Sequence, residues 1–167
     1  MSFNFSEIFK EQPKSVIYDE LYKMAGGLFQ DERDMLANMG NISSLLYFNL
    51  ENINWAGFYL YKNAELVLGP FNGKVACTRI AMGRGVCGSS AKENKIQIVE
   101  DVHEFPGHIA CDSASNSEIV IPLYKDGKLL GVLDIDSTEK ANFDEEDAKG
   151  LEKIVQLLIQ KTDINIL

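Results

Sequence analysis

The apolar pattern of the chain changes its period twice, and this constrains the fold more than any other feature. Apolar side chains recur at helical spacing over residues 14–29 and 31–50, and again over residues 144–159. From Ile53 onward the period is two, and the segments that follow are short and strand-like. Strands clustered between terminal helices predict an α+β fold, in which a central antiparallel sheet has the N- and C-terminal helices packed on one face.

Local signals predict the individual elements. In the first strand, Trp55 and Tyr59 fall on one face and Phe58 on the other. Asp31 and Asp144 are the predicted N-caps of the second and the last helix. We expect a short helix and further strands, the helix at 85–93 and the strands at 65–69, 75–81, 95–99, 118–124 and 128–136.

Length and charge narrow the classes of function. The chain has 167 residues, 46% of them hydrophobic, and no linker or internal repeat, so we expect a single domain over residues 1–167. Its formal net charge of −9 argues against a nucleic-acid partner, which needs a basic surface. No apolar run approaches the roughly 20 residues of a membrane helix. Residues 1–10 show no signal-peptide pattern, so we expect a cytoplasmic protein without a membrane partner.

Three cysteines, Cys77, Cys87 and Cys111, include no CxxC pair. An odd number in a reducing compartment argues against a structural disulfide framework, and a pair that does form there is more often catalytic. Cys77 lies in a strand-like apolar segment and Cys87 among small residues, so burial as inert thiols is the simpler interpretation for both. Cys111 lies within residues 101–117, which show no period, and an exposed loop is where a thiol can react.

Two histidines, His103 and His108, share this loop with Cys111. Their spacing from the cysteines fits no common structural zinc site, so we expect no bound metal and two solvated histidines. If the loop folds back, His108 could lower the pKa of the Cys111 thiol.

Asp134 and Asp136 share one face of a strand that is otherwise apolar. Two carboxyl groups there are costly unless paired or protonated, although a strand end that reaches solvent also explains them. Glu118 on the preceding strand joins them only in some registers. A two-residue turn pairs Glu118 with Ile135, whereas a three-residue loop at 125–127 pairs it with Asp134. We predict the three-residue loop, because of the two it is the one that gathers the three acids.

Two further features indicate ligand binding. Trp55 and Tyr59, together with the acids, would form a pocket wall suited to a small cation, unless the two aromatic side chains are plain core. Residues 83–88 (GRGVCG) could form a turn that leads into a helix N-terminus, where main-chain amides bind anions. A glycine-rich turn alone is a weak signal.

Five short motifs carry a resemblance to one enzyme family. They are residues 54–59 (NWAGFY), 68–71 (LGPF), 76–80 (ACTRI), 83–88 (GRGVCG) and 133–137 (LDIDS). In these motifs the chain resembles the free methionine-R-sulfoxide reductases, which are stand-alone GAF-domain enzymes, and the similarity runs from residue 18 to residue 159. The resemblance implies a GAF-like fold and reduction of free L-methionine (R)-sulfoxide by thiol chemistry.

The resemblance also implies roles for the cysteines. Cys111 would attack the sulfoxide sulfur and become a sulfenic acid. Cys77 would convert the sulfenic acid to a disulfide, and Cys87 matches an auxiliary cysteine of the family. No bound cofactor is implied, and an external dithiol such as thioredoxin would reduce the disulfide.

The pocket residues follow from the same resemblance. Glu118, Asp134 and Asp136 match the pocket acids of the family, and Trp55 and Tyr59 match its aromatic wall. A carboxylic acid kept neutral by crowding could protonate the sulfoxide oxygen, while the remaining carboxylates hold the ammonium group of the substrate. Main-chain amides of residues 83–87 could hold the carboxylate of the substrate.

Other functions are compatible with the same residues. A GAF fold can serve as a non-enzymatic sensor that binds a ligand, or as a thiol switch without a substrate. A plain binding pocket does not need Cys77, Cys111 and Asp136 together, and this trio favours the enzyme. A zinc protein is a more distant alternative.

The apolar residues of the first two helices, together with the way GAF domains pair, predict a possible homodimer.

Overall fold

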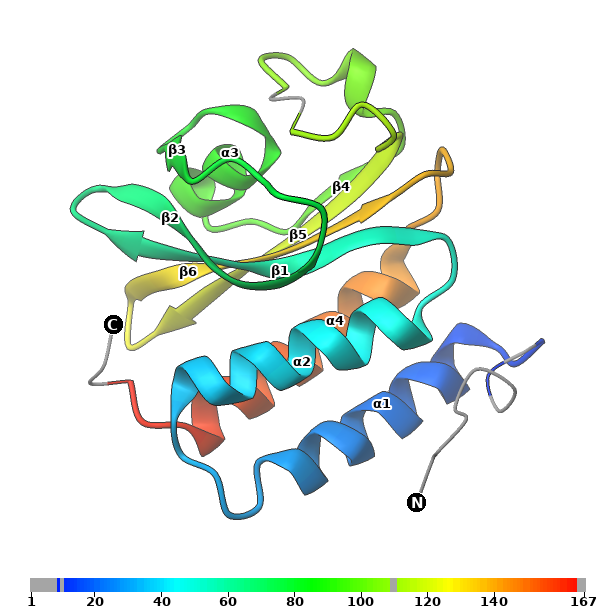
Figure 1. Cartoon of the computed structure of the whole chain (residues 1–167), viewed down its shortest axis with the longest axis vertical. Helices are drawn as coiled ribbons and strands as arrows, with labels where there is room; N and C mark the ends of the chain where they lie inside the picture. Colours follow the sequence, from blue (N-terminus) through cyan, green and yellow to red (C-terminus); the bar gives the residue numbers. More distant parts are fainter. Residues whose placement is uncertain (1–8, 10, 109–110, 165–167) are drawn as a thin grey trace.

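The structure is a computed structural model that describes residue 9 and residues 11–108 and 111–164 (Figure 1). Its elements are, in chain order, α1 (Lys14–Leu28), α2 (Met35–Asn49), β1 (Ile53–Lys62), β2 (Glu65–Gly73), β3 (Arg79–Ala81), α3 (Gly85–Glu93), β4 (Gln97–Val99), the 3-10 helix η2 (Val102–Glu104), β5 (Ser117–Lys125), β6 (Lys128–Ser137) and α4 (Glu145–Lys161). Within these ranges, none of the helices has both the length and the apolar character that a membrane crossing requires.

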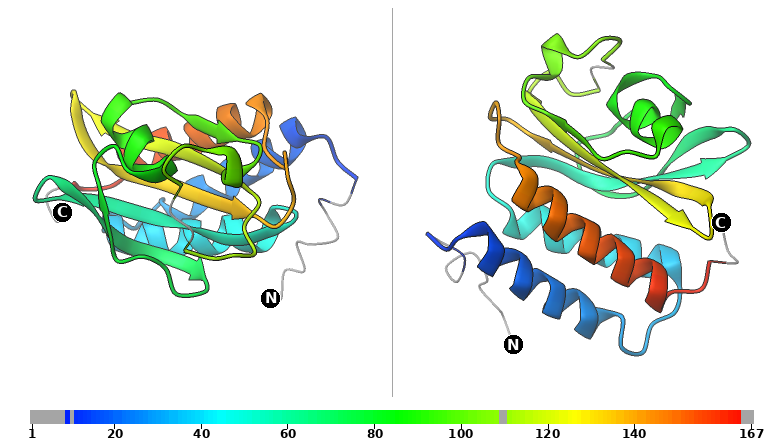
Figure 2. Two further views of the ribbon diagram at one scale, coloured as in Figure 1. Left: turned by 90° about the horizontal axis from the view of Figure 1, so that it is seen from above. Right: turned by 180° about the vertical axis from the view of Figure 1, so that it is seen from behind.

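The strands form one antiparallel sheet in the order β3-β2-β1-β6-β5-β4. Helices α2 and α4 pack against one face of this sheet, and α1 lies outside them, mainly against α4. Helix α3 and the loops around it cover the opposite face (Figures 1 and 2). The predicted α+β fold, with terminal helices on one face of an antiparallel sheet, is confirmed.

Alternation along β1 divides the apolar side chains between two cores. Ala56, Phe58 and Leu60 belong to the larger core beneath the helices, and each is at most 3% exposed. Trp55 and Tyr59 point to the other face and belong to a smaller core beneath α3. The period of two that the sequence shows from Ile53 is therefore the period of a strand buried on both faces. The second face is the one that carries the candidate site.

The helix starts follow their capping chemistry. Asp144 caps α4 as predicted, in a capping box with Asp147. Asp34, and not the predicted Asp31, caps α2, because the Asp34 carboxylate accepts a hydrogen bond from the Ala37 N–H at 2.8 Å. The Asp34 N–H in turn donates to Glu32, which holds the preceding residues outside the helix.

Candidate active site

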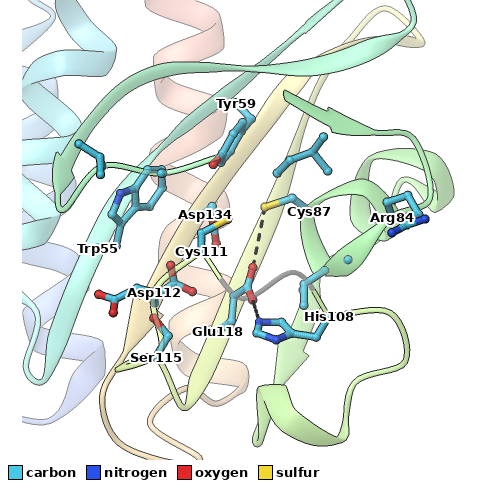
Figure 3. A pocket seen from close by; sticks show the side chains of 16 residues that line it. Trp55, Tyr59, Arg84, Cys87, His108, Cys111, Asp112, Ser115, Glu118 and Asp134 are labelled. Atoms are coloured by element: carbon cyan, nitrogen blue, oxygen red, sulfur yellow. Dashed lines mark hydrogen bonds and ion pairs between the residues drawn. The ribbon is translucent and has the colours of Figure 1, made fainter. Parts of the chain in front are cut away.

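A pocket lies on the sheet face opposite α1, α2 and α4, between the strands, α3 and two loops (Figure 3). The two loops are residues 74–78, which join β2 to β3, and the segment that precedes β5. The sequence predicted eight site residues, and seven of them line this pocket. They are Trp55, Tyr59, Cys87, Cys111, Glu118, Asp134 and Asp136. Cys77 reaches it through a disulfide bond.

Cys77 and Cys111 form a disulfide across the mouth of the pocket, with their Cα atoms 5.9 Å apart. The bond joins the 74–78 loop to the segment before β5, although the two cysteines are 34 positions apart in the chain. Cys111 is exposed and Cys77 is half-buried. The sequence has three cysteines, so Cys87 is left as the free thiol in this state.

The prediction of a strand over residues 75–81 is wrong for its first half, since β3 begins at Arg79. Cys77 therefore lies in a loop and not on a strand. The Trp55 indole N–H donates to the Lys74 carbonyl at 3.1 Å, and the Tyr59 hydroxyl donates to the Cys77 carbonyl at 3.0 Å. These two side chains donate hydrogen bonds to loop carbonyls that have no partner strand, and they hold the 74–78 loop against the pocket floor.

The loop that carries Cys111 is anchored by polar contacts that the sequence analysis missed. The Asn54 side-chain amide donates to Asp112 at 3.3 Å and to the Ser115 hydroxyl at 3.0 Å. The Asp112 carboxylate also accepts the Ala114 N–H at 2.9 Å, and this bond is the main reason that the pKa of Asp112 is lowered. An aspartate that bonds the amide two positions onward is an Asx-turn, so the Asp-Ser-Ala order after Cys111 was an available signal.

Trp55 and Tyr59 form the aromatic wall of the pocket and are 4% and 2% exposed. Their rings stack with centroids 5.9 Å apart, and the ring of Phe71 also stacks on Trp55, with centroids 5.2 Å apart. The two interpretations left open by the sequence, pocket wall and core, both hold, because these rings are packed on one side and face the pocket on the other.

The three acids meet on one face of the sheet, but in a register that the sequence analysis did not predict. Residues 126–127 make a two-residue turn in which Asp126 and Gly127 have φ of 52° and 75°. The predicted three-residue loop is therefore wrong. A β-bulge near Leu123 then shifts the register by one, so that Glu118 lies opposite Asp136 instead of Ile135 or Asp134.

Burial controls the chemistry of these acids. Glu118 and Asp134 are each 6% exposed, and Asp136 is partly buried. Burial, reinforced by Asp134 and other nearby carboxylates, raises the pKa of Glu118 and of Asp136 well above the usual range, and burial raises the pKa of Asp134 to about 6. Three crowded carboxyl groups cannot all ionise, so at least one is held protonated near neutral pH.

Cys87 lies in the first turn of α3 and is buried, as the sequence predicted. Its Sγ is 3.8 Å from the Glu118 carboxylate, and burial followed by the charge of Asp134 raises the pKa of its thiol well above the usual range. Cys87 is therefore a protonated thiol in this environment.

The two histidines occupy different environments. His103 is exposed, as expected, and contacts Asn116. His108 lines the pocket with its side chain 15% exposed, and its Nε2 is 3.9 Å from Glu118 (Figure 3). The expectation that His108 is solvated is thus wrong. Burial lowers the pKa of His108, which favours the neutral ring.

The first turn of α3 borders the same pocket. Gly85, Val86 and Cys87 are its first three residues, and their N–H groups have no acceptor within the helix. The turn before them is tight, since a side chain at Gly88 would begin 2.5 Å from the Ala81 carbonyl. Free amides on one side and carboxyl groups on the other allow the pocket to hold a ligand that carries both charges.

Comparisons with known proteins cover nearly the whole chain. The family model of the GAF domain matches residues 46–159. A protein of Escherichia coli named free methionine-R-sulfoxide reductase is 52% identical over 145 residues, which are 87% of this chain and 88% of that protein. A Saccharomyces cerevisiae protein of the same name is 44% identical over 153 residues, 87% of this chain and 85% of its own length.

The structural comparison agrees with these matches. An X-ray structure of the free methionine-R-sulfoxide reductase from Neisseria meningitidis, in complex with its substrate, superposes with a TM-score of 0.89. The two chains are 42% identical, and the match covers 93% of this chain and 94% of that chain. The similarity therefore extends over most of both chains.

Proposed function

The chain belongs to the free methionine-R-sulfoxide reductases, a family of GAF-domain enzymes, and on this premise we propose that it reduces free L-methionine (R)-sulfoxide to L-methionine. One observation carries the proposal for this chain: a Cys77–Cys111 disulfide closes over a pocket whose floor holds three crowded acids. A thiol pair and a buried proton source are the two things that sulfoxide reduction requires. A pocket that only binds a ligand requires neither.

The first chemical step falls to Cys111. Its thiolate attacks the sulfoxide sulfur while a pocket acid protonates the oxygen, which draws electrons from sulfur and favours the attack. The net change is one thiol and one sulfoxide giving methionine and a sulfenic acid on Cys111. Cys111 suits this role because it is exposed on the pocket loop, where a thiol meets an incoming ligand.

The second step falls to Cys77. Its thiol attacks the Cys111 sulfenic acid, the S–O bond breaks, and the oxygen leaves as water while the disulfide forms. The two thiols together thus supply two electrons, and the sulfoxide oxygen ends in water. Cys87 is buried and protonated on the pocket floor, and we assign it an auxiliary role as a reserve thiol.

The pocket walls account for a free amino acid as the substrate. Glu118, Asp134 and Asp136 would share the tasks of protonating the oxygen and holding the ammonium group. The amides of the first turn of α3 would hold the carboxylate. Trp55 and Tyr59 would enclose the side chain between ring faces. A substrate clamped at both ends leaves no room for a peptide chain.

An external dithiol of the thioredoxin type would complete the cycle. Cys111 is an exposed residue in the disulfide form, and this supports attack on the disulfide by the thiolate of a reductant. Such a cycle suits the cytoplasm, where the compartment keeps cysteines reduced between turnovers. We propose no bound cofactor, because the two cysteines carry both electrons.

Substrate selectivity tests this function. Reduced protein with a dithiol reductant is given free methionine (R)-sulfoxide, the free S epimer, and the R epimer with its amino group acetylated; released methionine or acetylmethionine is counted. We expect turnover of the free R epimer alone, because acetylation removes the ammonium charge that the acids would hold. Equal turnover of the acetylated compound contradicts the clamp. Binding of the free R epimer without turnover supports a sensor instead.

A further inference from the structure

Three side chains on the pocket floor have the geometry of metal ligands. Cys87 Sγ and one carboxylate oxygen each from Glu118 and Asp134 all lie within 4.8 Å of one another, and all three residues are buried. Tetrahedral zinc with ordinary bond lengths places its ligand atoms about 3.3–3.8 Å apart. The Cys87–Glu118 separation is already 3.8 Å, so small side-chain movements complete the arrangement.

Among the described residues that line the pocket, Arg84 is the one with a permanent positive charge. Asp134 is 94% buried, and its Oδ1 has no hydrogen-bond partner among the residues that the structure describes. Arg84 lines the pocket but is exposed at its rim, on the side of α3 (Figure 3). An unpaired buried oxygen among acidic neighbours is strongly stabilised by a cation.

The types of donor atom select the kind of cation. One thiolate, two carboxylates and the nearby His108 imidazole, 3.9 Å from Glu118, suit a borderline metal ion such as Zn²⁺ or Co²⁺. Mg²⁺ and Ca²⁺ prefer six or more oxygen ligands and gain nothing from a sulfur donor. The free volume of the pocket in the disulfide form is about 40 Å³, which is room for one ion.

We infer that Cys87, Glu118 and Asp134 form a binding site for Zn²⁺, that His108, beside Glu118, can supply a fourth ligand, and that the bound ion excludes substrate. The Cys87 thiol releases its proton to solvent when the ion binds. The ion is a competitor and not a cofactor, because it uses the acids assigned above to the substrate; only this inhibitory consequence rests on the proposed function. Cysteine and histidine spacing does not reveal the site, since two of its ligands are acids on neighbouring strands.

The test uses the disulfide form, in which Cys77 and Cys111 cannot bind a metal ion and Cys87 is the remaining thiol. Co²⁺ is titrated into the protein and near-ultraviolet absorption is recorded, because a cobalt–thiolate bond gives a charge-transfer band. We expect the band to saturate at one ion per chain and to be abolished by Zn²⁺. Cys87→Ser should remove the band, and Glu118→Gln should weaken binding by about tenfold or more, the loss that even an outer-shell partner can cause.

Glu93→Gln is the matched control, since Glu93 is an exposed acid at the end of α3 outside the pocket. It should bind Co²⁺ like the unchanged protein. Absence of the band in the unchanged protein overturns the inference, and this result needs no variant to fold. Equal weakening by Glu118→Gln and Glu93→Gln overturns it as well. The absorption is measured without turnover, so failure of the proposed reductase activity is a separate result. If both inferences hold, Zn²⁺ should inhibit turnover competitively with the sulfoxide.

Discussion

The three cysteines differ in exposure, and this difference gives each of them a different chemical role. Cys111 is exposed and Cys77 is half-buried in the neighbouring loop. Cys87 is buried, and burial, reinforced by the nearby acids, raises the pKa of its thiol. A nucleophile must reach the substrate, whereas a resolving thiol has only to reach the first sulfur. The order of reaction should therefore be Cys111 first and Cys77 second.

Cysteine variants test this order in a single turnover without reductant. Cys111→Ser should release no methionine, because the attacking thiolate is gone. Cys77→Ser should release about one methionine per chain and then stall as a sulfenic acid, since its usual resolving thiol is missing. Methionine is counted by amino-acid analysis, and a dimedone-type probe traps the sulfenic acid.

The double variant Cys77→Ser, Cys87→Ser is the control, because Cys87 could act as a reserve thiol in the single variant. It should show the longest-lived sulfenic acid of the set. A full single turnover by Cys111→Ser would mean that another thiol attacks the sulfoxide.

Residue types on the pocket floor were predictable, but their pairing was not. Trp55, Tyr59, Asp134 and Asp136 were identified from strand alternation, since polar or aromatic residues on one face of a buried strand need a partner. The partner of Cys77 was implied only by the family resemblance, because chain separation carries no information on which loops meet. The Asn54 contacts with Asp112 and Ser115 were missed, since they depend on how the loop folds over β1.

The β5–β6 hairpin shows why element position is harder to predict than element type. Both strands and the turn residues were recognised, yet the register was wrong. The Asp126–Gly127 turn alone would place Glu118 on the far face, and the bulge restores it to the acid cluster. Gly131 lies at the shift, where a side chain would begin 2.1 Å from the Tyr59 carbonyl, and this glycine was the available sign of an irregularity.

Helix packing makes Gly150 of α4 a sensitive position. A Cβ at Gly150 would begin 2.1 Å from the ring of Tyr18, whose hydroxyl donates to Asp147 at 2.8 Å. Gly150→Ala should therefore lower the free energy of unfolding by about 1–3 kcal/mol through overpacking, despite the better helix propensity of alanine. Urea denaturation followed by circular dichroism measures the change.

Gly40→Ala is the matched substitution, since it lies within α2 and its new Cβ would have no neighbour within 4 Å. It should raise the free energy of unfolding by about 0.4–1 kcal/mol. A stabilising Gly150→Ala would show that α1 and α4 do not pack as described.

Across the whole molecule, the layered fold was predictable because each layer imposes its own period on the sequence. Helical stripes and a period of two are properties of local geometry, so they can be recognised in the sequence without knowledge of tertiary contacts. The loops over the pocket carry no such period. Their shape comes from the disulfide, from Asn54 and from the aromatic side chains beneath them, and these contacts join distant parts of the chain.

The outer surface of the terminal helices predicts a homodimer. Tyr22 on α1 is 40% exposed, and Phe48 on α2 is 68% exposed, although both are large apolar side chains. Burial of such side chains against a second copy would stabilise a dimer. Light scattering at micromolar concentration should give the mass of two chains, and the mass of one chain would contradict this prediction.

The number of thiols consumed and of methionine molecules released in one turnover tests most directly whether the pocket reduces methionine sulfoxide. Fully reduced protein is mixed with excess free methionine (R)-sulfoxide and no reductant; methionine is counted and the disulfide is mapped by mass spectrometry. We predict about one methionine per chain and a Cys77–Cys111 bond, because each cycle consumes those two thiols. Release of no methionine, or release without that disulfide, would contradict this reaction cycle.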